Sequence, residues 1–266
     1  MCTIENKPLA FYEVDESGKI YQEELIPHLL CTARLATELF TDKIKSLAKT
    51  NSEIDVWSAL KISTYLHDIG KASDYYYQKF MPIENTLQFT GHHVISGLLV
   101  YGAAMLNKFP SKIKNTLKIS SKIIASHHMA IVTKARGISG DQFLKVKQII
   151  LALNEKWIEE IIDVGVRGEL LSRDIGEAVM GVVKTARRDN AKELLNLYSA
   201  FQALGRDESI DWKKIYRALT GILIVSDNIV ASSKRGKPTL FVKLLSRELK
   251  LDLNYVEKRC KELAQR

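Results

Sequence analysis

The stretch Asp55-Val56-Trp57-Ser58-Ala59-Leu60-Lys61-Ile62-Ser63-Thr64-Tyr65-Leu66-His67-Asp68-Ile69-Gly70 indicates the fold of this chain. Its apolar residues recur at the spacing of one helix face. Asp55 is a typical helix N-cap, and Gly70 is a typical helix stop. Residues 56–69 are therefore predicted to form a helix that ends in a histidine and an aspartate.

The same helical spacing continues along most of the chain, whereas strand-like alternation with turn pairs is nearly absent. An all-α fold is predicted, with further helices over residues 25–48, 91–108, 111–129, 142–153, 175–188, 191–204 and 212–233 and two short helices after them. Only about the first 20 residues look extended, with a strand and turn before the first long helix. The apolar stripe of that helix points His28 inward. We expect a single domain over residues 1–266, with a variable middle at about residues 135–210.

The composition is that of an ordinary globular protein. The chain has 266 residues, of which 46% are hydrophobic and 26% are charged, and this excludes a disordered or collagen-like chain. A formal net charge of +8 and a sequence pI near 9.2 favour polyanionic partners without identifying one. There is no signal-peptide layout, and Asp227 interrupts the apolar residues 219–230, so no membrane contact is expected.

The three cysteines, Cys2, Cys31 and Cys260, are far apart and cannot all pair. They predict neither a disulfide framework nor a thiolate metal site, and the expected location is a reducing cytoplasm.

The six histidines all fall beside apolar stretches of predicted helices: His28, His67, His92, His93, His127 and His128. A single histidine of this kind is usually a packed, hydrogen-bonded core residue. Several on different helices favour a metal site, because helical bundles build such sites from inward side chains of facing helices. Imidazole suits Mn, Fe, Co, Ni, Cu or Zn. The two oxygens of Asp68 can bridge two ions, and ions about 3.5–4 Å apart can activate a water and stabilise the leaving oxygen of a phosphate ester.

The order of these residues resembles the HD superfamily of metal-dependent phosphohydrolases. More narrowly, four motifs resemble the HD nuclease of type I CRISPR interference systems: His67-Asp68-Ile69-Gly70-Lys71 with Tyr77-Gln78 behind it, His92-x-x-x-Ser96, His127-His128, and Ser226-Asp227-x-x-x-Ala231-Ser232. The resemblance runs from His28 to Ser232. It implies an all-helical HD bundle with the metal site between facing helices. Members of that family are often fused to a helicase motor, and because none follows here, a stand-alone nuclease subunit is implied.

The resemblance also implies the ligands of two divalent ions. One ion is held by His28, His67, Asp68 and Asp227, and the other by Asp68, His92, His127 and His128. The family ligand is followed by three residues and a serine, which selects His92 and leaves His93 a supporting or packing role. The implied ions are Mn, Co, Ni or Fe, with Mg possible.

Asp68 and Lys71 are the implied catalytic residues. Asp68 keeps both ions in register, and Lys71 offsets charge on the phosphate oxygens. The structural alternative for Lys71 is a helix-terminal cation that satisfies the carbonyls after Ile69.

Three sequence features offer contacts to nucleic acid. Lys234, Arg235 and Lys237, just past Asp227, are the favoured substrate contacts. Tyr77 belongs to an aromatic run, residues 75–77, from which a ring can stack on a splayed base, although at least one of these rings is expected to pack in the core. Lysines 114, 118 and 122 form a stripe that helical spacing turns away from the double histidine, so a solvated face is expected there.

The predicted function is a metal-dependent nuclease that degrades DNA, preferably single-stranded, in CRISPR antiviral defence. The predicted partners are a separate helicase and a crRNA-guided complex, which supplies the sequence specificity. RNA and duplexes remain possible substrates. Two alternatives stay open: an HD nucleotide phosphohydrolase that acts on dNTPs or cyclic nucleotides, and a non-catalytic nucleic-acid-binding subunit that metals merely stabilise.

Overall fold

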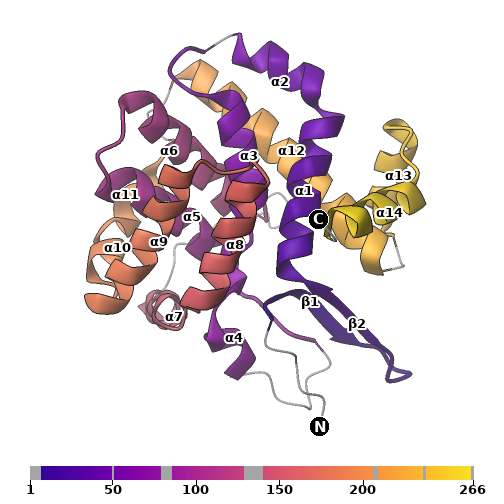
Figure 1. The fold of residues 1–266 in the computed structure, drawn as a ribbon, viewed down its shortest axis with the longest axis horizontal. Helices are drawn as coiled ribbons and strands as arrows, with labels where there is room; N and C mark the ends of the chain where they lie inside the picture. The colour runs from indigo at the N-terminus through magenta and orange to yellow at the C-terminus, as the bar shows by residue number, and fades with distance from the viewer. Residues whose placement is uncertain are drawn as a thin grey trace.

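Helices form most of the described structure, so the all-α prediction is confirmed. The computed structural model describes residues 7–49, 51–78, 86–128, 140–205, 209–235 and 238–264. Among these residues, one two-stranded antiparallel sheet is the only regular β structure. It projects from the lower end of the helical body (Figure 1).

The N-terminal hairpin consists of β1 (Leu9–Val14) and β2 (Ile20–Glu24). Its turn forms because the Asp15 carboxylate accepts hydrogen bonds from the Ser17 and Lys19 amides, at 2.9 and 3.0 Å, and because Gly18 adopts a φ of 79°, which is free of steric cost only for glycine. The sequence predicts the first strand and the turn. It does not predict the second strand, which leads directly into the first helix.

The predicted helix over residues 25–48 is in fact two helices, α1 (Leu25–Leu39) and α2 (Thr41–Ala48). The chain leaves helical geometry at Phe40, with φ −114° and ψ 17°, and neither glycine nor proline marks this break in the sequence.

The stretch that indicates the fold forms α3 (Val56–Leu66) and, after His67 and Asp68, the 3-10 turn η1 (Ile69–Lys71). Asp55 caps α3 as predicted, because its carboxylate accepts the Ser58 amide at 3.0 Å. The remaining helices are α4 (Asp74–Gln78), α5 (His92–Leu106), α6 (Ser111–Ser126), α7 (Gly140–Leu151), α8 (Glu155–Arg167), α9 (Arg173–Arg188), α10 (Lys192–Asn196), α11 (Tyr198–Ala203), α12 (Ile210–Arg235), α13 (Leu240–Glu248) and α14 (Leu253–Ala264).

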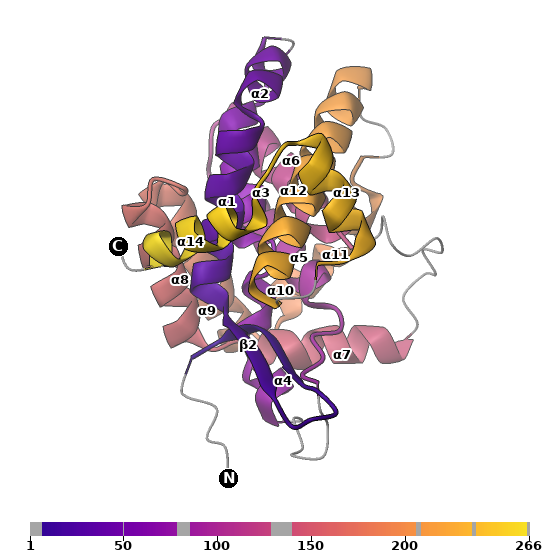
Figure 2. The same cartoon turned by 90° about the vertical axis from the view of Figure 1, so that its right-hand side faces the viewer.

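Three apolar clusters hold these helices together. The largest lies between the hairpin, α1, α3, α5 and α6 on one side and α7 to α11 on the other, so the expected variable middle contributes to the main core. A second cluster joins α1, α2, α3, α6 and α12. The third, smaller cluster joins α1, α12, α13 and α14, which lie together in Figure 2. Helix α1 contributes to all three clusters, and this fixes the position of its first turn.

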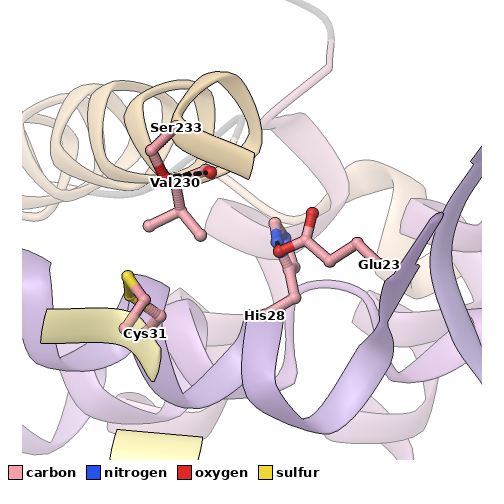
Figure 3. Close-up of a disulfide and its surroundings, with 6 residues drawn as sticks. Glu23, His28, Cys31, Val230 and Ser233 are labelled. Atoms are coloured by element: carbon pink, nitrogen blue, oxygen red, sulfur yellow. Dashed lines mark hydrogen bonds and ion pairs between the residues drawn. A yellow bond between two sulfur atoms is a disulfide. The ribbon is translucent and has the colours of Figure 1, made fainter. Parts of the chain in front are cut away.

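The third cluster contains a disulfide between Cys31 of α1 and Cys260 of α14 (Figure 3). The two Cα atoms are 5.3 Å apart, a normal separation for a disulfide. The sequence indicated no disulfide framework, and this single bond corrects that expectation. The two residues are 229 positions apart, and only the packing of α14 against α1 brings them together.

Helix α12 has the length and the apolar composition of a membrane span: within Ile210–Ser233, one window of 18 residues has a mean hydropathy of 1.2. Half of this apolar window is buried inside the protein, where its residues enter the second and third clusters. This is the situation of a core helix, and it places Asp227 among the histidines.

Candidate metal centre

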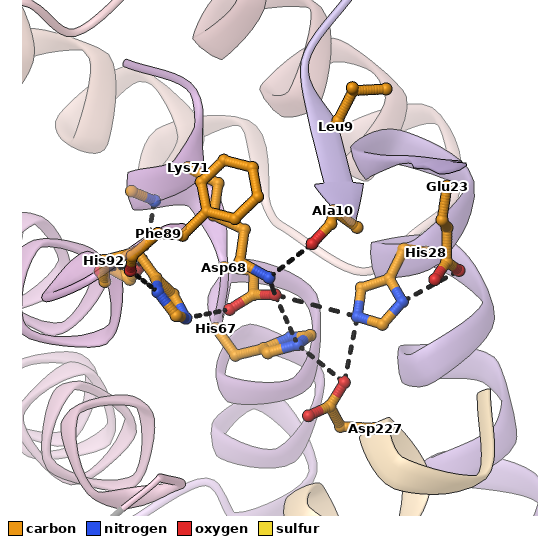
Figure 4. A network of polar contacts seen from close by, with 12 residues as sticks. Leu9, Ala10, Glu23, His28, His67, Asp68, Lys71, Phe89, His92 and Asp227 are labelled. Carbon is orange, nitrogen blue, oxygen red and sulfur yellow. Dashed lines mark hydrogen bonds and ion pairs between the residues drawn. The ribbon is translucent and has the colours of Figure 1, made fainter. Parts of the chain in front are cut away.

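The seven predicted metal ligands lie together as two adjacent groups. One group contains His28, His67 and Asp227, and the other contains Asp68, His92, His127 and His128. Within each group one ligand atom per residue lies within 4.8 Å of all the others. Figure 4 shows His28, His67, His92 and Asp227 arranged around Asp68.

Most of these ligands stand at helix ends that point to a common centre. His67 directly follows α3, His92 begins α5, and His127 directly follows α6. His28 lies in the first turn of α1, and Asp227 lies in the C-terminal half of α12. The centre therefore forms only when five helices from distant parts of the chain pack together.

The contact between η1 and α5 brings the two halves of the centre together. The Ser96 hydroxyl accepts the Gly70 amide at 2.8 Å and donates to the His92 carbonyl at 2.9 Å. A Cβ on Gly70 would lie 2.5 Å from the carbonyl oxygen of His92. Gly70 and Ser96 thus serve the same structural purpose: they allow Asp68 to approach His92.

Asp68 is the residue between the two groups. Its Oδ1 lies 2.9 Å from His92 Nε2 and 3.7 Å from His127 Nε2. Its Oδ2 lies 3.5 Å from His67 Nε2 and 3.9 Å from His28 Nε2. One carboxylate oxygen therefore faces each group, which is the arrangement that a bridging carboxylate needs.

Four histidines present the same ring nitrogen to the centre. The Nδ1 atoms of His67, His92 and His127 each contact the carbonyl oxygen three residues earlier, which belongs to Thr64, Phe89 and Ile124 respectively. Because a carbonyl oxygen can only accept, Nδ1 must carry the proton. His28 achieves the same orientation differently, with Nδ1 at 3.1 Å from a carboxylate oxygen of Glu23. In all four rings Nε2 faces the centre.

Several atoms that face the centre lack a hydrogen bond although they are buried. They are the Nε2 atoms of His67 and His127 and the Oδ1 atom of Asp68. An unsatisfied buried polar atom costs about 1–3 kcal/mol, and native proteins contain few of them. Convergent imidazole nitrogens and carboxylate oxygens are the donors that divalent transition metals prefer. The residues present thus fit one metal ion in each group.

The charges in the centre keep both carboxylates ionised. Burial disfavours the charge on Asp68, but Lys71, His67 and His92 outweigh burial and hold the pKa of Asp68 well below its usual range. The same holds for Asp227, where burial is outweighed by His28 and His67, so its pKa is also well below the usual range. Burial lowers the pKa of His28, but Glu23 and Asp227 outweigh it and raise this pKa to about 9.

Lys71 is held inside the centre. Its Nζ lies 2.6 Å from Asp68 Oδ2, donates to the Ala10 carbonyl of β1 at 2.9 Å, and stands over the Phe89 ring at 5.0 Å from the ring centroid. The carbonyl that it reaches belongs to the hairpin and not to the end of its own helical turn, so Lys71 links the hairpin to Asp68.

The solvent-accessible side of the centre carries His93, His128 and Asp227, which are partly exposed. Burial lowers the pKa of both His93 and His128 to about 3, so both rings are neutral at pH 7. His93 belongs to neither ligand group, and its ring packs against His128 with the centroids 5.3 Å apart. A supporting role for His93 agrees with this position.

The predicted nucleic-acid contacts stay predictions. Tyr77 is half-buried, its hydroxyl accepts the Leu9 amide at 2.7 Å, and its ring packs against Trp157. The neighbouring Tyr76 is 4% exposed, which confirms that one ring of this run packs in the core. Lys237 and the side chains of Lys234 and Arg235 lie outside the described residues. Lysines 114, 118 and 122 are partly exposed.

Sequence reasoning missed Glu23, which is buried and contacts His28. It lies in β2, the strand that the sequence did not predict, and no motif marks it. Its position five residues before His28 is a signal only once the hairpin is known to fold back on α1.

What the structure supports directly is a mostly helical protein with buried histidine and aspartate groups suited to metal ions. No family model matches the chain, and no curated protein or solved structure matches it.

Proposed function

We propose that this chain is a two-metal phosphohydrolase of the HD type, and more narrowly a nuclease that cuts single-stranded DNA in CRISPR defence. The observation that carries the proposal is the position of Asp68, which turns one carboxylate oxygen toward each of two histidine groups. A centre for a single structural ion needs no such shared carboxylate, and structural sites are normally closed with four ligands.

In this proposal His28, His67, Asp68 and Asp227 hold one ion, and Asp68, His92, His127 and His128 hold the other. Bound divalent cations supply Lewis acidity, which activates water and stabilises negative charge on phosphate oxygens. Asp68 stays ionised at neutral pH because of Lys71 and its histidine neighbours. Lys71 restrains Asp68, and its positive charge would offset negative charge on a phosphate bound at the centre.

Two properties of the chain support a polymeric and acidic substrate. The formal net charge is +8, which attracts a polyanion. The exposed members of the centre are His93, His128 and Asp227, so one side of the centre can be reached from solvent. The order of motifs between His28 and Ser232, which resembles the CRISPR HD nuclease, narrows the proposal to DNA that a separate helicase and a crRNA-guided complex expose.

The proposed location is the cytoplasm, where such a complex would meet invading DNA. The disulfide removes the argument for this location that rested on unpaired cysteines. Intracellular disulfides do occur, notably in hyperthermophiles.

The test is cleavage of end-labelled single-stranded DNA by the purified chain in Mn²⁺, Co²⁺, Ni²⁺, Mg²⁺ or chelator, with duplex DNA, RNA and dNTPs in parallel. Asp68→Asn keeps the size of the side chain but removes the bridging charge, and it should abolish cleavage. Asp211→Asn is the matched control, because Asp211 is an exposed aspartate on the same helix as Asp227, and it should cut as the wild type does.

Each outcome separates the candidate functions. Metal-dependent cutting of DNA that is lost only in Asp68→Asn supports the nuclease. Hydrolysis of dNTPs with intact polynucleotides would replace it with a nucleotide phosphohydrolase. Metal binding without any hydrolysis would leave a subunit that metals stabilise.

A further inference from the structure

We propose that Glu23 is a positioning residue of the metal centre, which orients His28 and thereby tightens metal binding in the group of His28, His67 and Asp227. This inference rests on the proposed metal centre, but it does not depend on what the centre hydrolyses. The juxtaposition that carries it is a buried carboxylate on the ring edge of His28 that faces away from the centre.

Glu23 is placed for this role by the hairpin. In β2 the Glu23 side chain is the only fully buried one, and the neighbouring Gln22 is exposed. Strand alternation therefore turns Glu23 inward, and β2 packs against both α1 and α12, the helices that carry His28 and Asp227. The Glu23 and His28 side chains are 1% and 3% exposed, so their contact is shielded from water.

The geometry fixes which nitrogen of His28 faces the centre. Glu23 Oε1 lies 3.1 Å from Nδ1, and Asp227 Oδ1 lies 3.1 Å from Nε2 on the opposite edge of the ring. With Nδ1–H donated to Glu23, the Nε2 lone pair is directed to the position that an ion would take between His28, His67 and Asp227. Figure 4 shows Glu23, His28 and Asp227 in this order.

His28 is the exception among the four histidines that point Nε2 inward. The Nδ1 atoms of His67, His92 and His127 contact neutral backbone carbonyls. The Nδ1 atom of His28 instead contacts the carboxylate of Glu23. A carboxylate partner makes a ligating imidazole more basic, and removing such a partner typically costs about 10–100-fold in metal affinity.

The experiment is a titration of the full chain with Zn²⁺, followed by calorimetry and by competition with a chelator. Glu23→Leu removes both the charge and the acceptor, and Glu23→Gln keeps an acceptor of nearly the same shape. Glu24→Gln is the matched control, since the neighbouring Glu24 pairs with Lys7 at the surface. Asp227→Asn and His128→Gln assign each of the two binding transitions to its group.

We expect two bound ions in the wild type and in Glu24→Gln. Glu23→Leu should weaken one ion by at least about tenfold, namely the ion that Asp227→Asn also weakens, and should leave the other unchanged. Glu23→Gln should restore part of that affinity. In the Zn²⁺-loaded wild type, ¹⁵N spectra should show His28 protonated at Nδ1.

The inference is overturned if Glu23→Leu and Glu23→Gln bind both ions as tightly as the wild type. It is equally overturned if both ions weaken together, because that result indicates general damage to the fold. If Glu23→Leu does not fold, an unchanged Glu23→Gln decides against the inference. A wild type that binds two Zn²⁺ ions but cuts no DNA would refute only the proposed nuclease, and a wild type that binds none would refute the centre itself.

Discussion

Lys71 occupies the oxygen of Asp68 that an ion bound in the proposed centre would also contact. Nζ lies 2.6 Å from Oδ2, and both side chains are at most 10% exposed. Lys71 thus neutralises Asp68 when no ion is bound, and an ion held beside Oδ2 by His28, His67 and Asp227 would take over part of this neutralisation. The lysine therefore acts on the stability of the metal-free protein as well as on the centre.

Lys71→Met should destabilise the metal-free protein by about 3–5 kcal/mol, because it leaves a buried carboxylate without its cation. Mn²⁺ should then stabilise the variant more than it stabilises the wild type, since the ion replaces the missing charge. Urea unfolding with and without Mn²⁺ measures both effects. Lys45→Met, which breaks an exposed pair with Asp42, should change little, and an equal metal effect in all three proteins would contradict this replacement of charge.

Acid should destabilise the metal-free protein through the neutral histidines. Burial lowers the folded-state pKa of His92 to about 4 and those of His93 and His128 to about 3. Between pH 6.5 and 4 these histidines therefore bind protons in the unfolded chain but stay neutral in the folded chain. The free energy of unfolding thus decreases as the pH falls. His28 has a raised pKa of about 9, so its contribution is fully present below pH 6.5 and is lost only as the pH rises through 9.

Thermal unfolding in chelator across this range measures the acid effect. His128→Gln should reduce the slope of stability against pH by up to about 1.4 kcal/mol per unit. A slope that is unchanged in this variant would show that His128 titrates normally in the folded protein.

At the scale of elements, the contact of η1 with α5 leaves no room for a side chain on Gly70. Gly70→Ala would place a methyl group 2.5 Å from the His92 carbonyl oxygen and 3.0 Å from Ser96 Oγ. We expect a loss of about 1–3 kcal/mol in stability and weaker metal binding, because Asp68 must move away from His92. Gly221→Ala is the control, since a Cβ there meets nothing within 4 Å, and the alanine should stabilise α12 by about 0.5–1 kcal/mol. Equal stability of the two variants in urea unfolding would contradict this account of the contact.

Helix α3 could be predicted because each of its signals is local: the Asp55 cap, the apolar spacing and the glycine after it. Helix α8 was missed although local signals existed. Asn154 caps it by accepting the Trp157 amide at 3.2 Å, and the buried Ile158 and Ile161 lie on one face. The breaks at Phe40 and at Leu197, which separates α10 from α11, leave no such trace. They follow from how the flanking helices pack.

At the scale of the whole molecule, a metal site could be predicted because the few histidines lie on separate predicted helices, whereas the division of the ligands into two groups came from the resemblance to the HD superfamily. Their convergence around Asp68 is a product of the three apolar clusters meeting at α1, and Glu23 could not be found without the fold of the hairpin. The pairing of Cys31 with Cys260 likewise depends on the docking of α14. Long-range contacts of this kind leave no spacing pattern in the sequence.

Reduction of the disulfide should lower the stability of the whole protein. A cross-link of this kind typically contributes about 2–4 kcal/mol, mainly by restricting the unfolded chain. Thermal unfolding with and without a dithiol, and of Cys260→Ala, should show the same decrease. Cys2→Ser should behave as the wild type, and a dithiol that leaves the melting temperature unchanged would mean that the bond adds no stability.

The disulfide also gives the chain a mechanical property. Cys31 and Cys260 close residues 31–260 into a covalent ring, so a force applied on either side of it cannot extend the chain inside the ring. A machine that unfolds proteins by pulling on one end must stop at the first cysteine of the ring or thread two strands at once. A single protease cut inside the ring would leave one molecule, whose two pieces separate only after reduction. Under tension, the residues between the two cysteines therefore stay within one covalent loop until a reductant breaks the bond.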